Sequence, residues 1–240
     1  MNGRAALVTG GSSGIGLAIA RALGEDGYGL TVSARRPEKL EEAVRGLTDA
    51  GLDAQAVPAN MADEDAIKSV VDAHRERYGR LDVLINNAGI GIGSPIAEAE
   101  TKKVDIQLGV NLRGVYLTLR ECIPMLKEAG AEHGKALVVN TASIAGVQGQ
   151  PWLAMYSATK AGVIGLSQSA HGELAGDGIQ VTAFAPGFVD TPMTDWTKGE
   201  IPAEEMIRPE DIAEAVRFLL RTSPACIVPE IRFVRPSDNM

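Results

Sequence analysis

Tyr156 and Lys160 stand four residues apart within a predicted helix, 154–175. Residues at this spacing share one helix face, so the phenol and the ammonium are expected to lie side by side. A free tyrosine has a pKa of about 10, and a neighbouring cation favours the phenolate and lowers that pKa. The pair could therefore exchange a proton with a carbonyl or alcohol oxygen.

Two further polar residues could serve the same chemistry. Ser143 follows the predicted strand 136–140, and Asn111 lies in a long helical region, 101–129, that is expected to break near this asparagine. When a hydride moves to or from a carbonyl carbon, the oxygen must gain or lose a proton in step. The Ser143 hydroxyl can hold the substrate oxygen, Lys160 can also bond a nicotinamide ribose, and Asn111 can hold a water that leads protons toward Lys160.

Glycines cluster between the predicted strand 5–9 and the helix that follows it, with the spacing G-x-x-x-G-x-G. Glycines let the backbone approach a pyrophosphate, and a helix N-terminus offers it free N–H groups and a positive dipole. The expected phosphate-binding residues are Gly10, Ser12, Ser13, Gly14, Ile15 and Gly16; the alternative is a purely structural turn. The run also fits G-x-S-x-G with Ser12 as a hydrolase nucleophile, but such an elbow follows several strands and here only one precedes it.

The residues after the next predicted strand, 30–33, indicate which dinucleotide is bound. An NAD site has Asp or Glu about 20 residues beyond the glycines, to hold the ribose hydroxyls. Arg35 and Arg36 stand there instead, and guanidinium groups make bidentate contacts with phosphate. We interpret them as a clamp on the 2′-phosphate of NADP(H), with Arg35 ahead of Arg36. The alternative is two solvated charges at a helix start.

Short apolar strands alternate with helical patterns along the whole chain. The strands are predicted at 5–9, 30–33, 54–57, 81–86, 136–140, 179–185 and 231–234. This alternation predicts an α/β Rossmann fold: one doubly wound parallel sheet of about seven strands with helices on both faces. Residues 1–240 are expected to form a single domain, and the irregular stretch 187–208 is the expected substrate flap.

Composition narrows the function classes. The 240 residues carry a net charge of −8 without a basic stripe, which argues against nucleic-acid binding. No apolar run approaches a membrane span, and the N-terminal stretch is too short for a signal peptide, so a cytoplasmic protein is expected. His74, His133 and His171 lack metal-ligand spacing and are predicted to be surface or interface residues. Cys122 and Cys226 are predicted to be small buried hydrophobic side chains, and no metal site is expected.

Together the motifs resemble the short-chain dehydrogenase/reductase family, from Ala5 to about Val189 and more loosely beyond. They are the glycine run Thr9–Gly16, Asn86-Asn87-Ala88-Gly89, the tetrad Asn111, Ser143, Tyr156 and Lys160, and Pro186-Gly187 followed by Val189-Asp190-Thr191. The resemblance implies that Tyr156 is the catalytic acid/base and Lys160 its electrostatic partner and ribose ligand. It implies further that Ser143 anchors the carbonyl and that Asn111 serves a proton relay.

The same resemblance implies a cofactor site and agrees with NADP, because Arg after the second strand accompanies NADP in this family. It adds to the glycine run, the arginines, Tyr156 and Lys160 the residues Asn60, Met61, Asn87, Ala88, Gly89, Pro186, Gly187, Val189 and Thr191. Asn60 departs from the family, which usually has Asp there to contact adenine. An amide oxygen can still accept a hydrogen bond from the adenine amine.

By position, the substrate pocket is predicted to use Ser94, Ile144, Gln148, Trp152, Phe188, Met193 and Trp196. This mostly apolar set suits a small or medium carbonyl or alcohol. The tail 229–236 lacks the Gly-Gly ending common in 3-oxoacyl-carrier-protein reductases and is more similar to dehydrogenases of 3-hydroxy acids, so the acyl-carrier substrate is kept as a variant. A catalytically silent NADP-binding regulator is the other alternative, although such proteins typically lack the tyrosine.

The family usually forms dimers or tetramers through helices corresponding to 112–129 and 154–175. Both segments carry apolar residues on more than one face, among them Leu117, Met125, Val163 and Leu166. A homotetramer, or failing that a homodimer, is therefore expected.

Overall fold

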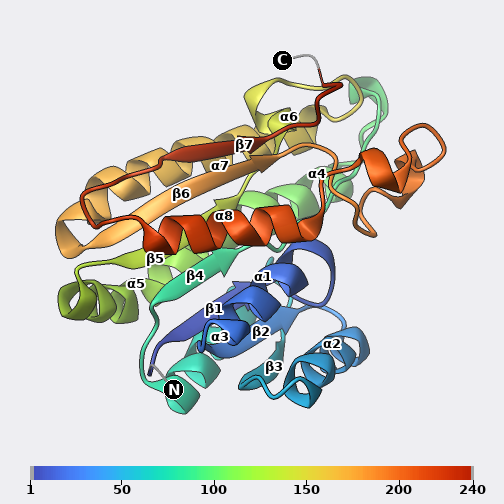
Figure 1. Ribbon diagram of the computed structural model, residues 1–240. Coiled ribbons are helices and arrows are strands. Elements are labelled where there is room, and N and C mark those ends of the chain that lie inside the picture. Colours follow the sequence, from blue (N-terminus) through green and yellow to red (C-terminus); the bar gives the residue numbers. More distant parts are fainter. Residues whose placement is uncertain (1–2, 239–240) are drawn as a thin grey trace.

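The computed structural model describes residues 3–238 and places seven strands in one parallel sheet (Figure 1). The strands are β1 (Ala5–Thr9), β2 (Gly29–Ala34), β3 (Ala54–Pro58), β4 (Val83–Asn86), β5 (Ala136–Thr141), β6 (Ile179–Pro186) and β7 (Glu230–Phe233). Their order across the sheet is β3-β2-β1-β4-β5-β6-β7, and every neighbouring pair is parallel. The predicted α/β fold with a doubly wound sheet is confirmed.

Helices cover both faces of the sheet, as predicted. One face carries α1 (Gly14–Glu25), α2 (Pro37–Asp49) and α8 (Pro209–Arg221), and the other carries α3 (Glu64–Tyr78), α5 (Gly114–His133) and α7 (Ala154–Leu174) (Figure 1). In α2, for example, Leu40, Val44 and Leu47 recur at helical spacing and are all buried. Two apolar cores result, one on each side of the sheet.

The strand order reverses between β1 and β4, which pair directly from Ala6 and Val83 to Thr9 and Asn86. From β1 the chain runs outward through β2 and β3, and it then crosses back to begin the other half of the sheet at β4. Ligands of open α/β sheets bind outside the carboxyl ends of the strands at such a reversal. The loops that follow β1 and β4 are therefore the first place to look for a site.

The long helical region changes its winding at the predicted position. Helix α4 (Thr101–Leu108) passes into one π-helical turn, Gly109–Arg113, and then into α5. The expected break near Asn111 is thus a widened turn within a continuous helix. Such turns occur frequently at functional sites. A short helix that sequence reasoning missed, α6 (Ile144–Val147), follows β5.

The stretch 187–208 contains two short 3₁₀ turns, Asp195–Thr197 and Ala203–Glu205. Its two ends are joined by an isolated parallel bridge between Val189 and Ile207. Met193 and Trp196 lie exposed between them. The segment therefore leaves the sheet after β6 as a closed loop.

Two predictions about individual side chains are wrong. His74 is fully buried, and both of its ring nitrogens have partners: Nδ1 lies 2.7 Å from Thr31 Oγ1 and Nε2 lies 2.8 Å from the Arg80 carbonyl oxygen. Cys122 is buried as expected, but Cys226 is exposed.

Within residues 3–238, no helix has both the length and the apolar character needed to cross a membrane. The same residues contain no group of three or more His, Cys, Asp or Glu side chains placed to hold a metal ion.

Candidate active site

Three of the predicted catalytic residues meet beyond the carboxyl end of β5. Ser143 begins α6; its Oγ accepts a hydrogen bond from the Ala145 N–H at 3.2 Å and donates one to the Pro186 carbonyl at 3.4 Å. Tyr156 lies in the first turn of α7 and Lys160 one turn later. The Lys160 Nζ lies 5.7 Å from the centre of the Tyr156 ring, so the predicted shared helix face brings these two groups together.

Burial shifts the pKa of both groups. It raises the pKa of Tyr156, although the Ser143 hydroxyl acts in the opposite direction by hydrogen-bonding the phenolate. Burial also lowers the pKa of Lys160 to about 8. The Lys160 Nζ donates to the Thr141 carbonyl at 2.7 Å, and the lowering of the tyrosine pKa by Lys160 stays a prediction. Tyr156 is therefore a protonated phenol near neutral pH, the form that can donate a proton.

Asn111 lies in the π-helical turn and is fully buried. Its Oδ1 accepts from the Ile90 N–H at 2.8 Å, and its Nδ2 donates to the Ile90 carbonyl at 2.8 Å and to Thr159 Oγ1 at 3.2 Å. Thr159 in turn donates to the Tyr156 carbonyl at 2.7 Å. Asn111 thus links the loop after β4 to the turn of α7 that carries the tyrosine.

The glycine run and the Asn-Asn-Ala-Gly motif pack directly against each other. A Cβ on Gly10 would lie 2.7 Å from the Ala88 Cα, and one on Gly16 would lie 2.4 Å from the Gly10 carbonyl oxygen. Thr9 Oγ1 accepts from the N–H groups of Asn87 and Ala88, each at 3.1 Å, and Asn87 Nδ2 donates to the Gly10 carbonyl at 3.1 Å. Thr9 is therefore a positioning residue; the sequence placed it at the start of the glycine run but assigned it no role.

This cradle fits a pyrophosphate. Ser13, the residue before α1, has an extended backbone and its side chain does not cap the helix, so the first N–H groups of α1 remain available for an anion. Ser12 is half-buried and Ser13 is exposed beside them, and Ile15 is half-buried in the first turn. Gly14 has a φ of +52°, and a Cβ there would lie 2.8 Å from Thr191 Cγ2. Gly14 and Thr191 therefore lie too close together for residue 14 to carry a side chain.

The two arginines after β2 are the predicted 2′-phosphate clamp. Arg35 and Arg36 are both exposed, and within residues 3–238 neither side chain forms a hydrogen bond or ion pair. Beyond the neighbouring strand β3, Asn60 is exposed and its Oδ1 accepts from the Ala62 N–H at 3.2 Å. Met61 is buried, with its Sδ 4.0 Å from Thr118 Oγ1. Gly89 stands between catalytic side chains, since a Cβ there would lie 3.3 Å from Lys160 Nζ.

The C-terminal segment holds the Pro186-Gly187 motif in place. The Gly187 N–H donates to the Phe233 carbonyl at 2.8 Å. The Arg235 guanidinium lies 5.2 Å from the centre of the Phe188 ring and pairs with Asp238 at 2.6 Å. Sequence reasoning missed this contact; the Arg-x-x-Asp spacing at the chain end was its only signal. Val189, next along, is buried.

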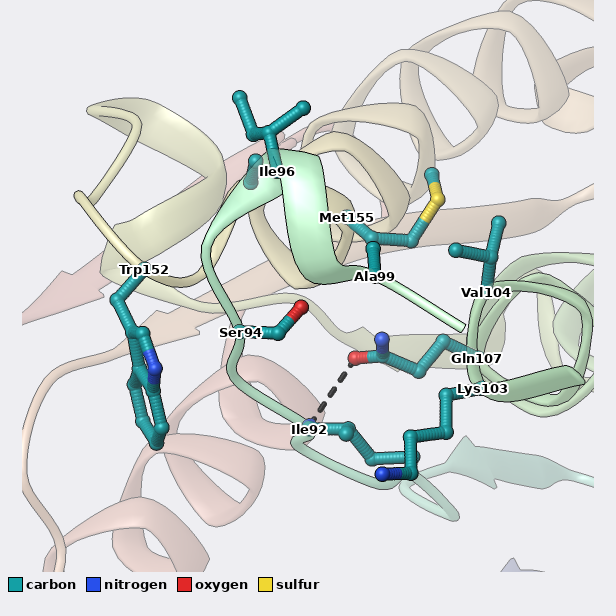
Figure 2. Close-up of a pocket in the computed structure, with 10 residues that line it drawn as sticks. Ile92, Ser94, Ile96, Ala99, Lys103, Val104, Gln107, Trp152 and Met155 are labelled. Carbon is teal, nitrogen blue, oxygen red and sulfur yellow. Dashed lines mark hydrogen bonds between the residues drawn. The ribbon is translucent and has the colours of Figure 1, made fainter. Parts of the chain in front are cut away.

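A cavity of about 380 Å³ lies between the loop after β4, α4 and the start of α7 (Figure 2). Of the seven residues predicted to form the substrate pocket, Ser94 and Trp152 line it. The other five lie outside it: Ile144, Gln148, Phe188, Met193 and Trp196. Sequence reasoning missed the α4 side of this cavity, because apolar residues at helical spacing are read as core positions.

The comparisons with known proteins agree with this geometry. The model of the short chain dehydrogenase family matches residues 4–200. The chain belongs to the short-chain dehydrogenase/reductase family. The resemblance carried by the sequence motifs is therefore confirmed.

Individual members of the family are similar over most of their length. The 3-oxoacyl-[acyl-carrier-protein] reductase FabG of Staphylococcus aureus is 39% identical over 227 residues, covering 90% of each chain. Among solved structures, an actinorhodin polyketide ketoreductase with NADPH is 35% identical with a TM-score of 0.86, covering 95% of each chain. A 3-ketoacyl-(acyl-carrier-protein) reductase from Brucella melitensis, complexed with NADH, is 32% identical with a TM-score of 0.87, covering 96% of each chain.

As a short-chain dehydrogenase/reductase, the chain is an oxidoreductase that acts on carbonyl or CH–OH groups with a nicotinamide cofactor. The cradle formed by the glycine run and the Asn-Asn-Ala-Gly motif is the part of the structure that fits such a dinucleotide.

Proposed function

We propose that the protein is an NADPH-dependent carbonyl reductase in which Tyr156 donates the proton. The observation that carries this is the convergence of a half-buried Tyr156 with the Ser143 hydroxyl and the Lys160 side chain. Ser143 holds the substrate oxygen, and Lys160 holds the nicotinamide ribose. Bound NADPH supplies the hydride. Asn111 connects the turn of α7 that carries Tyr156 to the loop after β4 through its hydrogen bonds. We also assign Asn111 to the proton relay.

The choice of NADPH rests on this chain's own residues, because the similar structures hold either NADPH or NADH. Arg35 is exposed and its side chain is not paired with any group in residues 3–238. A free guanidinium next to the expected adenosine ribose favours a 2′-phosphate.

For the substrate, we propose a ketone with an apolar body, and 3-oxoacyl thioesters are the first class to test. The 39% identity to a 3-oxoacyl-carrier-protein reductase supports that class more strongly than the divergent tail at 229–236 argues against it. The acyl-carrier variant thus moves ahead of 3-hydroxy acids.

One kinetic experiment tests the proposal. Oxidation of NADPH and NADH is followed with a panel of ketones for the wild type, Tyr156→Phe and Arg35→Ala. Loss of the proton donor should lower kcat by about 10²- to 10⁴-fold in Tyr156→Phe while NADPH binding persists. Loss of charge-assisted hydrogen bonds should raise the KM for NADPH by roughly 10- to 100-fold in Arg35→Ala and leave NADH almost unaffected.

The matched control for the arginine is Arg45→Ala, an exposed arginine on α2. An unchanged rate in Tyr156→Phe would overturn the mechanism. Equal losses for both cofactors in Arg35→Ala would overturn the clamp. A wild type that binds NADPH without reducing any ketone would favour the silent regulator.

We also propose a homotetramer, on a different basis from the sequence. Leu117, Met125 and Val163 are buried within the chain's own core, so they do not call for a partner. Tyr116 on α5 is 53% exposed and is the stronger indication of a contact surface. A monomeric mass by light scattering would contradict this proposal.

A further inference from the structure

The tail after β7 folds into a closed turn. Strand β7 lies at the edge of the sheet beside β6 (Figure 1). Beyond it, Arg235 Nε and Nη2 donate to Asp238 Oδ1 at 3.1 and 2.6 Å, and the Arg235 N–H donates to Asp238 Oδ2 at 2.9 Å. The Asp238 N–H closes the turn by donating to the Arg235 carbonyl at 3.0 Å. We call Arg235–Asp238 the C-terminal turn.

The two charges of the C-terminal turn hold each other in place. The Arg235 side chain is only 10% exposed, so removal of its partner would leave a nearly buried charge. Burial alone would raise the pKa of Asp238, but the hydrogen bonds from Arg235 outweigh burial and lower that pKa. Both groups are therefore charged at neutral pH, and the guanidinium is fixed in one orientation.

The C-terminal turn packs against the two residues that follow β6. The Arg235 guanidinium lies 5.2 Å from the centre of the half-buried Phe188 ring, within the ~6 Å range of a cation–π contact. A Cβ on Gly187 would lie 3.4 Å from Asp238 Oδ2 and 3.3 Å from the Phe233 carbonyl oxygen. That carbonyl accepts the Gly187 N–H at 2.8 Å. The tail therefore holds Gly187 through its backbone and Phe188 through its ring.

These two residues lie in a segment, Pro186–Thr191, that connects a catalytic group to the phosphate cradle. At its start, the Pro186 carbonyl accepts from Ser143 Oγ at 3.4 Å. At its end, Thr191 Cγ2 would lie 2.8 Å from a Cβ on Gly14, at the first residue of α1. A dinucleotide with its pyrophosphate at α1 and its reactive ring near Ser143 therefore runs along this segment.

The base of the expected flap is tied to the same point. The Phe188 carbonyl accepts from the Ile207 N–H at 3.0 Å, and the Asp190 N–H donates to the Ile207 carbonyl at 2.9 Å. The backbone of Phe188 thus closes the loop 187–208 while its ring contacts the tail. A change in the C-terminal turn would therefore reach both the segment and the flap base.

We propose that the C-terminal turn positions Pro186–Thr191 against the nicotinamide half of the cofactor, with Arg235 as the positioning residue. This inference rests on the proposed function, because it takes the reactive ring to lie near Ser143 and Tyr156. Arg235 acts through Phe188 and Gly187, not through contact with the reacting atoms. Loss of its guanidinium should therefore loosen the nicotinamide half of the cofactor and leave the adenosine half in place.

The first experiment compares two ligands that share the adenosine half. Kd values for NADPH and for 2′,5′-ADP, which has no nicotinamide, are measured by calorimetry. Arg235→Ala should raise the Kd for NADPH about tenfold, since it removes a partly desolvated cation–π contact, and should leave the Kd for 2′,5′-ADP as in the wild type. Arg235→Lys keeps the charge without the planar fork, so its Kd for NADPH should lie between those of the wild type and Arg235→Ala.

The matched control is Arg232→Ala. Arg232 lies on β7, is exposed and pairs with Glu230. Its removal takes away an arginine from the same strand end without touching Gly187 or Phe188. Both Kd values should stay as in the wild type.

The second experiment follows NADPH oxidation with the best ketone of the panel at saturating NADPH. A misplaced nicotinamide lowers the rate of hydride transfer, so kcat should fall about tenfold in Arg235→Ala while the KM for the ketone changes less than twofold. A purely structural role would weaken both ligands and lower the fraction of active protein without this split. Urea denaturation of Arg235→Ala and Arg235→Lys identifies the folded variants, and Arg235→Lys carries the test if the alanine variant does not fold.

Equal rises in Kd for NADPH and 2′,5′-ADP would overturn the inference, as would an unchanged Kd for NADPH in folded Arg235→Ala. A wild type that reduces no ketone, in which Arg235→Ala still weakens NADPH alone, would count against the proposed function and support the positioning role of the tail.

Discussion

The two sides of the site are built in different ways. On the cofactor side, backbone meets backbone: the glycine run, Asn87 and Ala88 are held within hydrogen-bonding distance, with no room for a side chain. On the substrate side, half-exposed side chains from three segments meet around Trp152. The first arrangement recognises a constant ligand, and the second can change its specificity by exchanging side chains without altering the backbone.

Gly16→Ala should have the largest effect of the substitutions considered, because it disrupts the packing of the glycine run against Asn87. The added methyl would lie 2.4 Å from the Gly10 carbonyl oxygen and 2.5 Å from Asn87 Nδ2, and backbone cannot move away cheaply. We expect a loss of about 3 kcal/mol in unfolding free energy and of NADPH binding, measured by urea denaturation and fluorescence titration.

The control for this variant is Gly46→Ala, in α2, where a Cβ meets nothing within 4 Å. Removing a glycine from a helix interior should stabilise the protein by roughly 0.5–1 kcal/mol. Similar stability changes in the two variants would show that the cofactor side tolerates side chains after all.

His74, buried between α3 and β2, makes the stability of the protein sensitive to acid. The Nε2–H donates to the Arg80 carbonyl and Nδ1 accepts from Thr31, so the ring is neutral, and burial lowers its pKa from 6.5 to about 4. As the pH falls, the unfolded chain takes up this proton first, and stability is lost between about pH 6.5 and 4. About 2 kcal/mol should be lost between about pH 7 and pH 5.

Urea denaturation at the two pH values measures this loss. In His74→Gln the difference should shrink, whereas His133→Gln, at a partly exposed ring, should keep it. An equal pH dependence in His74→Gln and the wild type would assign the acid sensitivity to other groups.

Substitutions of Trp152, on the substrate side, should have the smallest effect, and they test its backbone strain alone. Trp152→Gly and Trp152→Ala both remove the indole, but only glycine accepts a φ of +68° without strain. The glycine variant should therefore be more stable than the alanine variant by about 1 kcal/mol, measured by urea denaturation. Equal stability would mean that the backbone relaxes once the indole is gone, and that the strain has no source beyond the ring.

The same contrast explains what the sequence could predict. The glycine run, the doubly wound parallel sheet and the Tyr156–Lys160 pair follow from local spacing, and the structure has the sheet and the pair as expected. The pKa of Tyr156 was not predictable, because it depends on burial and on the direction in which Lys160 points. The α4 wall of the cavity was missed as well, since Val104 has the same spacing as a core residue.

The π-helical turn at Gly109–Arg113 limits which length changes this chain can tolerate. Such a turn contains one residue more than an α-helical turn, and each residue rotates a helix by about 100°. Deleting one residue here would restore a regular helix but would turn α5 relative to α4. Either Asn111 or the buried face of α5 with Leu117 would then point the wrong way. The extra residue thus fixes the rotation of α5 about its axis relative to α4. Insertions and deletions in this stretch should therefore be selected against more strongly than substitutions.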